Sequence, residues 1–212
     1  MKLKLKICGM RDPDNIRKVI QIHPDYIGFI FYGPSPRYVG NYLDKIREVE
    51  IPDTIKKVGV FVDENLDEIL LNREKLSFSI VQLHGNESVT LCRELHKEGL
   101  EVIKVFSVGE TFNFEKMKNY AESVDYFLFD TKGKYYGGNS IPFNWTLIDD
   151  YPFDQPFFLG GGIEINNLPE IAKINNQYLY AVDANSRLES HPGFKDPQKL
   201  KMFKEKFDKI NT

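Results

Sequence analysis

Several side chains able to transfer protons come directly after short apolar runs of the sequence. Cys8 follows a run in which Leu5 and Ile7 alternate with lysines, the pattern of a β-strand. His84 and Asp130 end two other apolar runs. A thiolate can act as a base, and a carboxyl group at the end of an apolar strand can keep its proton and act as a general acid. These positions are candidates for acid–base catalysis, although a lone cysteine is more often a small buried hydrophobe and an aspartate often caps a helix.

Other segments offer groups that bind anions. Arg37 lies in a loop stiffened by Pro34 and Pro36, where a fixed cation could bind a carboxylate or could simply be a surface charge. Gly160–Gly162 follow an apolar run and precede a helix, so backbone N–H groups there could approach a phosphate. A simple glycine turn that binds no ligand would have the same sequence. The polar stretch Asp183–Arg187 follows the last apolar run. Together these segments favour a phosphate site.

Eight short runs suited to β-strands recur along the chain. Most of them are apolar on both faces, which is typical of parallel strands buried between helices and a core. Their starts are spaced by about one βα unit. The predicted strands are Leu3–Cys8, Tyr26–Phe31, Val58–Val62, Ile80–His84, Val102–Val108, Tyr126–Asp130, Phe157–Gly160 and Ala181–Asn185.

Segments with helical periodicity lie between these runs. Asp12 and Pro13 begin the first, Asn86 is placed to cap another before Gly99 ends it, and Asp196 opens the last. The segment Thr111–Glu122 is polar and gives only a weak helical pattern. The apolar stripes are Ile16, Val19 and Ile20; Leu43, Ile46 and Val49; Leu66, Ile69 and Leu70; Val89, Cys92 and Leu95; Leu168, Ile171 and Ile174; and Leu200, Phe203 and Phe207, with a shorter helix at Ile148.

Strands that alternate with helices predict an α/β protein with a parallel sheet, and eight units favour closure into a (β/α)8 TIM barrel. An open flavodoxin-like or Rossmann sheet is the alternative, but no Gly-x-Gly-x-x-Gly follows the first strand. In a barrel, reactive residues collect at the C-terminal ends of the strands. The candidate residues above lie at those ends. We expect a single barrel domain over residues 1–212.

Composition excludes several other classes of protein. The chain has 212 residues and a net charge of −3, so nothing global indicates binding to nucleic acid or to an anionic membrane. No apolar run approaches the length of a membrane span, and the N-terminal apolar segment is too short for a signal peptide. Cys8 and Cys92 lack the spacing of a metal site. We expect a reduced, cytoplasmic protein without a disulfide framework.

The sequence resembles phosphoribosylanthranilate isomerase, a (β/α)8 barrel enzyme of tryptophan biosynthesis, over nearly its full length and in the right order. The first and fourth matching stretches are specific, whereas the triple glycine alone would not be. The matching stretches are Lys6–Met10, Gly28–Phe31, Ser35–Tyr38, Val58–Val62, Val81–Gly85, Leu128–Thr131, Tyr136–Gly138, Gly160–Gly162 and Pro192–Asp196.

The resemblance implies an Amadori rearrangement of N-(5'-phosphoribosyl)anthranilate to 1-(2-carboxyphenylamino)-1-deoxyribulose 5-phosphate. It implies that Cys8 is the general base, Asp130 the general acid and Arg37 the ligand of the anthranilate carboxylate. It also implies no cofactor, no metal and a small phosphorylated substrate as the partner, in a monomer or a homodimer. Gln82, His84 and Asp183 would line the substrate site, and Gly161, Gly162, Asn185, Ser186 and Arg187 would surround the phosphate.

The stretch after the last predicted strand departs from the family pattern Asp-x-Ser-Ser-Gly-x-Glu. The chain reads Asp183–Glu189 there, and Arg187 stands in the place of the glycine. Arg187 could add a charge to the phosphate or point outward, and it would be strained if the glycine's positive φ were required. These alternatives concern phosphate binding and leave the family resemblance intact.

Three other functions are weighed against this isomerase. The histidine-pathway isomerase does the same chemistry but typically uses paired aspartates, with no cysteine on strand one. Indole-glycerol-phosphate synthase needs a catalytic lysine inside the barrel, and the predicted strand ends offer none. A barrel that has drifted to binding alone would be expected to lose Cys8 or Asp130, and both are present.

Overall fold

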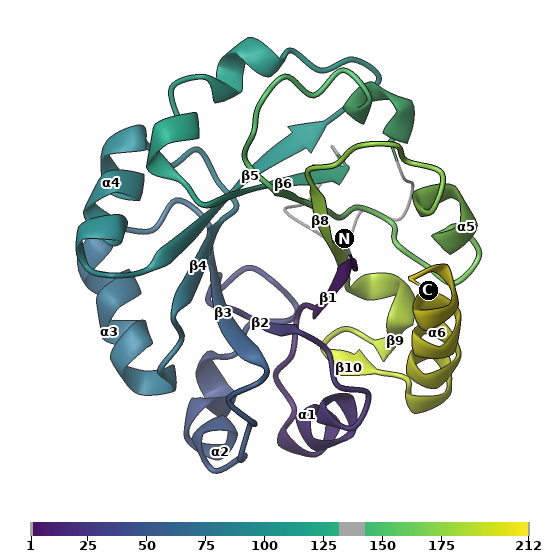
Figure 1. Cartoon of the computed structure of the whole chain (residues 1–212). Coiled ribbons are helices and arrows are strands. Elements are labelled where there is room, and N and C mark those ends of the chain that lie inside the picture. Colours follow the sequence, from purple (N-terminus) through teal and green to yellow (C-terminus); the bar gives the residue numbers. More distant parts are fainter. Residues whose placement is uncertain (1, 132–142, 212) are drawn as a thin grey trace.

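A computed structural model describes residues 2–131 and 143–211, so the matching stretch Tyr136–Gly138 lies outside the described residues. Eight parallel strands close into a barrel, in which each strand pairs with the next and the last pairs with the first (Figure 1). This architecture confirms the predicted (β/α)8 barrel and excludes the open sheet. The strands are β1 (Lys4–Ile7), β2 (Tyr26–Ile30), β3 (Lys56–Phe61), β4 (Ile80–Leu83), β5 (Glu101–Val108), β6 (Tyr126–Thr131), β7 (Phe157–Leu159) and β8 (Leu179–Ala184).

Helices surround the barrel, and a small hairpin precedes the last of them (Figure 1). The expected helix over Thr111–Glu122 is wrong, because that segment forms two short 3₁₀ segments, Phe114–Met117 and Ala121–Ser123. Another 3₁₀ segment, Trp145–Ile148, follows β6. The helices are α1 (Pro13–Ile20), α2 (Leu43–Arg47), α3 (Leu66–Leu76), α4 (Val89–Lys97), α5 (Leu168–Ile171) and α6 (Pro197–Ile210), and the hairpin strands are β9 (Glu189–His191) and β10 (Phe194–Lys195).

Side chains at the helix N-termini explain where the helices begin. The Asp12 carboxylate accepts the Asn15 N–H at 2.8 Å, and the Asp196 carboxylate accepts two N–H groups of α6. The cap of α4 is Ser88 rather than the predicted Asn86, since the Ser88 hydroxyl accepts the Leu91 N–H at 3.2 Å. The local signals therefore located these helices to within about two residues.

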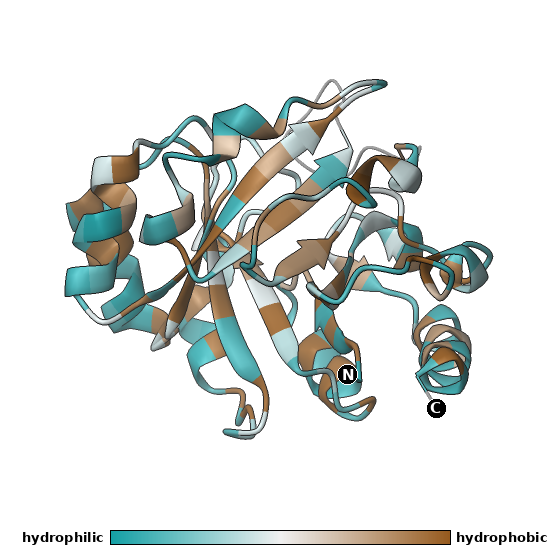
Figure 2. Cartoon of the chain, turned by 45° about the horizontal axis from the view of Figure 1, so that its top comes forward, coloured by the Kyte–Doolittle hydropathy of each residue, from teal (hydrophilic) through white to brown (hydrophobic). Residues whose placement is uncertain are grey.

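Alternation along the strands divides the core into two layers. On β1, Leu5 and Ile7 face the helices, whereas Lys6 and Cys8 face the barrel interior. The barrel interior is packed with aliphatic and aromatic side chains, among them Tyr26 and Phe158. Strands are mostly hydrophobic in Figure 2, whereas the surrounding helices carry both kinds of residue. This two-layer packing leaves only the strand ends open for polar side chains.

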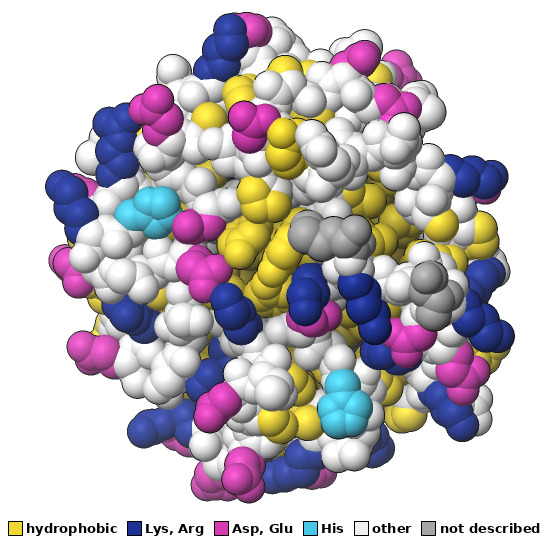
Figure 3. All heavy atoms as spheres, in the orientation of Figure 1, with side chains coloured by type: hydrophobic (Ala, Val, Ile, Leu, Met, Phe, Trp, Pro, Cys, Tyr) yellow, Lys and Arg dark blue, Asp and Glu magenta, His cyan; other side chains and the backbone are white. Residues whose placement is uncertain are grey.

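Charges of both signs are interspersed over the face seen in Figure 3, in keeping with the small net charge. Within the described ranges, no helix is both long enough and apolar enough to cross a membrane.

Candidate active site

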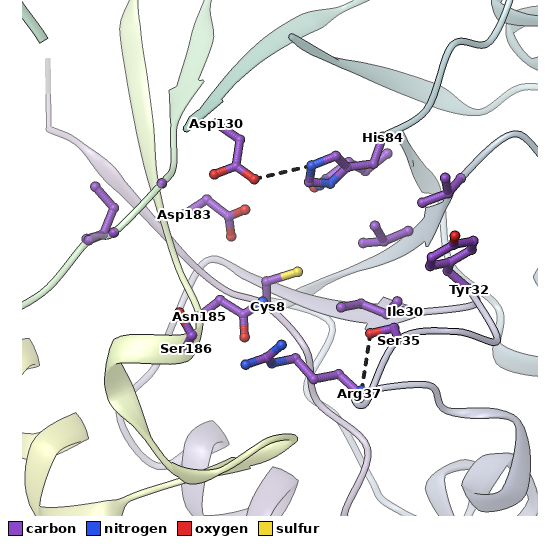
Figure 4. Close-up of a pocket in the computed structure, with 16 residues that line it drawn as sticks. Cys8, Ile30, Tyr32, Ser35, Arg37, His84, Asp130, Asp183, Asn185 and Ser186 are labelled. Carbon is purple, nitrogen blue, oxygen red and sulfur yellow. Dashed lines mark hydrogen bonds and ion pairs between the residues drawn. The ribbon is translucent and has the colours of Figure 1, made fainter. Parts of the chain in front are cut away.

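One pocket at the C-terminal ends of the strands gathers nearly all of the predicted site residues (Figure 4). They come from six strands or from the loops that follow them, so only barrel closure brings them together. Arg187 is the one predicted residue that does not line this pocket. The pocket is lined by the predicted Cys8, Arg37, Gln82, His84, Asp130, Gly161, Gly162, Asp183, Asn185 and Ser186, and also by Ile30, Tyr32, Ser35, Val60, Val62 and Ile163.

Cys8 lies in the middle of this pocket, between the carboxyl group of Asp130 and the guanidinium of Arg37 (Figure 4). Its backbone N–H donates to the Ala184 carbonyl at 2.9 Å, so the pairing of β1 with β8 continues through this residue. The thiol rests against β2, where a Cβ added to Gly28 would lie 2.7 Å from the sulfur. A glycine at position 28 is therefore what leaves room for the thiol.

Two opposing effects act on the protonation of Cys8. Burial raises the pKa of the thiol above its ordinary value, and Asp183 raises it further. The positive charges of Lys6 and Lys195 lower the pKa of the thiol, and Lys6 also hydrogen-bonds to it. Burial outweighs these charges and leaves the pKa of the thiol above its ordinary value, so a further positive charge nearby would make the thiol a better base.

Asp130, His84 and Gln82 lie next to one another on one side of the pocket. His84 Nε2 lies 3.2 Å from Asp130 Oδ2, and Gln82 Nε2 lies within hydrogen-bond distance of His84 Nδ1, at 3.3 Å. The amide of Gln82 donates through its nitrogen, so His84 Nδ1 is the acceptor in this contact. Gln82 Oε1 is buried and has no hydrogen-bond partner among the described residues, so it is placed to accept from a bound hydroxyl.

Lys6 and Asp183 form a buried ion pair beneath Cys8. They are directly opposite each other on β1 and β8, and Lys6 Nζ lies 2.9 Å from Asp183 Oδ1. Burial lowers the pKa of Lys6, but the negative charges of Asp183 and Cys8 outweigh it and raise the pKa above its ordinary value. The expectation that the barrel offers no interior lysine at its strand ends thus needs correction, because Lys6 lies inside β1. Alternation with Leu5 and Ile7 was the available signal.

Arg37 is held by a residue that the sequence reasoning missed. Glu189, at the start of β9, accepts hydrogen bonds from Arg37 Nε at 2.9 Å and from Arg37 Nη2 at 2.6 Å. Lys195, also missed, donates to the same carboxylate at 2.6 Å. Both residues lie in stretches singled out by the family resemblance, but Glu189 is 152 positions away from its partner Arg37.

The glycine segment after β7 adopts a conformation that favours glycine. Gly161 and Gly162 have φ values of +80° and +72°. The Asn167 side chain donates to the Gly162 carbonyl at 2.9 Å and accepts the Glu164 N–H, which fixes the turn. The turn thus places backbone next to the side chains of Asn185 and Ser186, where an anion could bind.

Arg187 lies at the edge of this region in an unstrained conformation. It belongs to the 3₁₀ segment Ser186–Leu188 and is not among the described residues with positive φ, so the predicted strain is absent. Its Nε lies 3.9 Å from Glu164 Oε2, and both side chains are 38% exposed. Arg187 therefore faces Glu164 outside the lining of the pocket.

No three His, Cys, Asp or Glu residues in the described part of the chain are grouped so that they could hold a metal ion. The expectation that no cofactor is needed stays a prediction.

Comparison with known proteins gives the family. The family model described as N-(5'phosphoribosyl)anthranilate (PRA) isomerase matches residues 5–206. The N-(5'-phosphoribosyl)anthranilate isomerase of Parabacteroides distasonis is 39% identical over 200 residues, which cover 94% of this chain and 90% of that protein. That of Phocaeicola vulgatus is 37% identical over 199 residues, 94% of this chain and 95% of that protein.

Solved structures agree with the sequence relatives. The phosphoribosyl anthranilate isomerase from Thermotoga maritima superposes with a TM-score of 0.85 at 33% identity, covering 98% of this chain and 99% of that one. A second structure, of a phosphoribosyl anthranilate isomerase in complex with reduced 1-(o-carboxyphenylamino)-1-deoxyribulose 5-phosphate, superposes with a TM-score of 0.81 at 32% identity over 98% and 99% of the two chains. The chain therefore belongs to the N-(5'-phosphoribosyl)anthranilate isomerase family of enzymes.

Proposed function

We propose that this chain catalyses the Amadori rearrangement of N-(5'-phosphoribosyl)anthranilate to 1-(2-carboxyphenylamino)-1-deoxyribulose 5-phosphate in tryptophan biosynthesis. The observation that carries the proposal is the placement of Cys8 and Asp130 across one pocket from each other, with Arg37 beside Cys8 (Figure 4). This arrangement offers an acid, a base and a carboxylate ligand to one small molecule. The family relationship supports the same reaction.

In the first step, Asp130 donates a proton to the furanose ring oxygen of the substrate. The bond between C1 and the ring oxygen breaks, and the nitrogen lone pair forms an iminium at C1. This step needs a carboxyl group that enters the reaction protonated. Thr131 N–H donates to Asp130 Oδ1 at 2.8 Å and His84 Nε2 lies 3.2 Å from Oδ2, so the carboxylate left behind is stabilised.

In the second step, the Cys8 thiolate removes the proton from C2 of the ribose chain. The electrons of that C–H bond form the C1–C2 double bond of an enolamine, which neutralises the iminium nitrogen. The enolamine then gains a proton at C1 while its C2 hydroxyl loses one, so that the C1–C2 double bond is replaced by the C2 carbonyl of the ketone product. The positive iminium lowers the cost of ionising the buried thiol, so the base becomes effective only after ring opening.

We assign the two anionic groups of the substrate to different residues of the pocket. Arg37 receives the anthranilate carboxylate, and backbone N–H groups at Gly161 and Gly162, with Asn185 and Ser186, receive the phosphate. Gln82 Oε1 is placed to accept from a ribose hydroxyl. Asp183 and Lys6 stay beneath the reacting carbons as a neutral pair.

The direct test is turnover, followed by the loss of the substrate's anthranilate fluorescence. We expect turnover in the wild type and a loss of about a hundredfold or more in Cys8→Ala and in Asp130→Asn, the low end for acid–base catalysis. Treatment with a chelator is expected to leave the rate unchanged, and a loss restored by a metal would contradict the cofactor-free mechanism. A folded wild type that binds a product analogue without turning over substrate would favour a barrel kept for binding alone.

We further propose that the enzyme works in the cytoplasm on a small phosphorylated substrate, without nucleic acid or membrane partners, as a monomer or a homodimer. One related structure is described as monomers of a dimeric phosphoribosylanthranilate isomerase from Thermotoga maritima. Light scattering of the purified chain distinguishes the two states.

A further inference from the structure

Glu189 is the centre of a buried ionic cluster that includes the carboxylate ligand Arg37. Its Oε1 accepts from Arg37 Nε at 2.9 Å, from Lys195 Nζ at 2.6 Å and from the Gly193 N–H at 3.0 Å. Its Oε2 accepts from Arg37 Nη2 at 2.6 Å and from Nε at 3.1 Å. The Glu189 side chain is only 4% exposed and that of Arg37 is 11% exposed. Such a fork of charge-assisted bonds holds a guanidinium in one plane.

The hairpin that carries Glu189 is itself anchored to the barrel. The Lys195 N–H donates to Asn15 Oδ1 and the Asn15 amide donates to the Lys195 carbonyl, both at 2.7 Å, which ties β10 to α1. Lys195 Nζ also donates to Asn185 Oδ1 at 2.8 Å. The position of the Glu189 carboxylate, which accepts hydrogen bonds from Arg37, is thus fixed by α1, by β10 and by the loop after β8.

Glu189 binds one hydrogen-bonding edge of the Arg37 guanidinium and leaves another edge for a ligand. Arginine presents two bidentate edges, a side edge formed by Nε and Nη2 and an end edge formed by Nη1 and Nη2. Glu189 occupies the side edge of Arg37. Arg37 lines the pocket with its head group close to Cys8 (Figure 4), so the end edge is the one that a ligand meets.

The charge of the cluster also suits an anionic ligand. Burial raises the pKa of Glu189, but hydrogen bonds and charges from Arg37 and Lys195 outweigh it and leave the pKa below its ordinary value. Glu189 is therefore ionised at neutral pH. Arg37 lines the pocket and Lys195 does not, so the guanidinium is the positive charge of this cluster that a ligand carboxylate meets.

We propose that Glu189 is a positioning residue that turns the end edge of Arg37 toward the pocket and thereby makes the site selective for ligands that carry an aromatic carboxylate. The inference rests on the proposed function, in which Arg37 binds the anthranilate carboxylate. Glu189 touches no substrate in this account and acts only through Arg37. Its removal would leave a mobile guanidinium that binds carboxylates less well, while the phosphate end of the site keeps its contacts.

The test compares two ligands by calorimetry. One is reduced 1-(o-carboxyphenylamino)-1-deoxyribulose 5-phosphate, and the other is the same compound without the carboxylate. The ratio of their dissociation constants measures carboxylate selectivity and cancels general damage to the site. In Glu189→Gln we expect this ratio to fall by about tenfold or more, the size expected when a well-placed bond to a charged group is lost. Affinity for the ligand without the carboxylate should stay nearly unchanged.

Three further variants complete the design. Glu189→Asp keeps the negative charge between Arg37 and Lys195, and so protects the fold, but withdraws the carboxylate by one methylene; its ratio should fall as well. Lys195→Met is the matched control, because it breaks the same buried cluster while leaving both bonds to Arg37, and its ratio should stay near that of the wild type. In an Arg37→Met background, Glu189→Gln should have no additional effect on the ratio.

Wild-type selectivity in both Glu189→Gln and Glu189→Asp would overturn the inference, as would an equal loss in Lys195→Met. These results are separable from a failure of the proposed function. A wild type that shows carboxylate selectivity dependent on Glu189 but no turnover would refute the isomerase and keep the positioning role.

Discussion

At the scale of single residues, the site depends on a thiol in an unfavourable environment. Cys8 is buried, and that burial raises its pKa, while Lys6 below it lowers the pKa. Since the proposed base is the Cys8 thiolate, activity should increase with pH as the thiol ionises. The sequence places Lys6 on the strand face opposite to Leu5 and Ile7. Nothing local indicates that this face, with its lysine, is the one turned into the barrel.

Replacing Lys6 by Met should therefore raise the pKa of the Cys8 thiol. The rising limb of kcat/KM against pH should move to higher pH in Lys6→Met, since a positive charge that favours the thiolate is lost. The measurement is the pH profile, together with the rate of Cys8 alkylation by iodoacetamide in a Cys92→Ala background. Lys4→Met is the control, because Lys4 lies two residues earlier on β1 and pairs with Asp25. Identical profiles for Lys6→Met and the wild type would contradict this role.

Gly28 makes a second prediction at this scale. A Cβ at this position would lie 2.7 Å from the Cys8 sulfur, so Gly28→Ala must displace the thiol. We expect kcat to fall by about tenfold to a hundredfold, because a displacement of about 1 Å is enough to misalign proton transfer. Gly33→Ala is a suitable control, since nothing lies within 4 Å of a Cβ there. Normal kcat in Gly28→Ala would show that the thiol does not need its observed position.

At the scale of elements, features set by residues close together in the sequence were predicted, whereas features set by distant residues were not. Asp12 and Asp196 cap helices as predicted, because capping involves residues two or three positions apart. The hairpin of β9 and β10 escaped prediction, because its strands are very short and Glu189 finds its partner Arg37 152 positions away. No periodicity in one sequence reports a contact of that range.

The loop after β4, which carries His84, is held by another buried ion pair. Lys104 Nζ donates to Glu87 at 2.8 Å and to the Gly85 carbonyl at 2.8 Å, and the other oxygen of Glu87 accepts the Gly85 N–H at 2.8 Å. Lys104→Met leaves the buried carboxylate without its cation and should lower the free energy of unfolding by about 3–5 kcal/mol.

Urea denaturation measures that loss, and Lys56→Met provides the comparison. Lys56 also pairs with a glutamate on β5, Glu101, but both side chains are about one third or more exposed, at 45% and 34%. Its loss should cost less than about 1 kcal/mol. Equal destabilisation by the two variants would contradict the importance of the buried pair.

At the scale of the whole molecule, closure of the barrel is what turns scattered motifs into a site. The sequence predicted eight strands and the end at which the polar residues meet, since parallel strands share a direction. It could not predict which side chains would touch. The contacts of His84 with Asp130, and of Lys6 with Asp183, depend on register and rotamer across the closed barrel.

A single closed barrel should also unfold as one unit. We predict one cooperative transition with the same midpoint by far-ultraviolet circular dichroism and by fluorescence of Trp145, the only tryptophan in the chain. Separate midpoints for the two probes would contradict a single domain over residues 1–212.

The central claim is that Cys8 removes the C2 proton, and the release of deuterium from substrate labelled at C2 tests it most directly. The wild type should release the label to water at the rate of turnover. Cys8→Ala should release it at least about a hundredfold more slowly, while still binding the reduced product analogue. Release at the wild-type rate from Cys8→Ala would place the base elsewhere in the pocket and contradict the account.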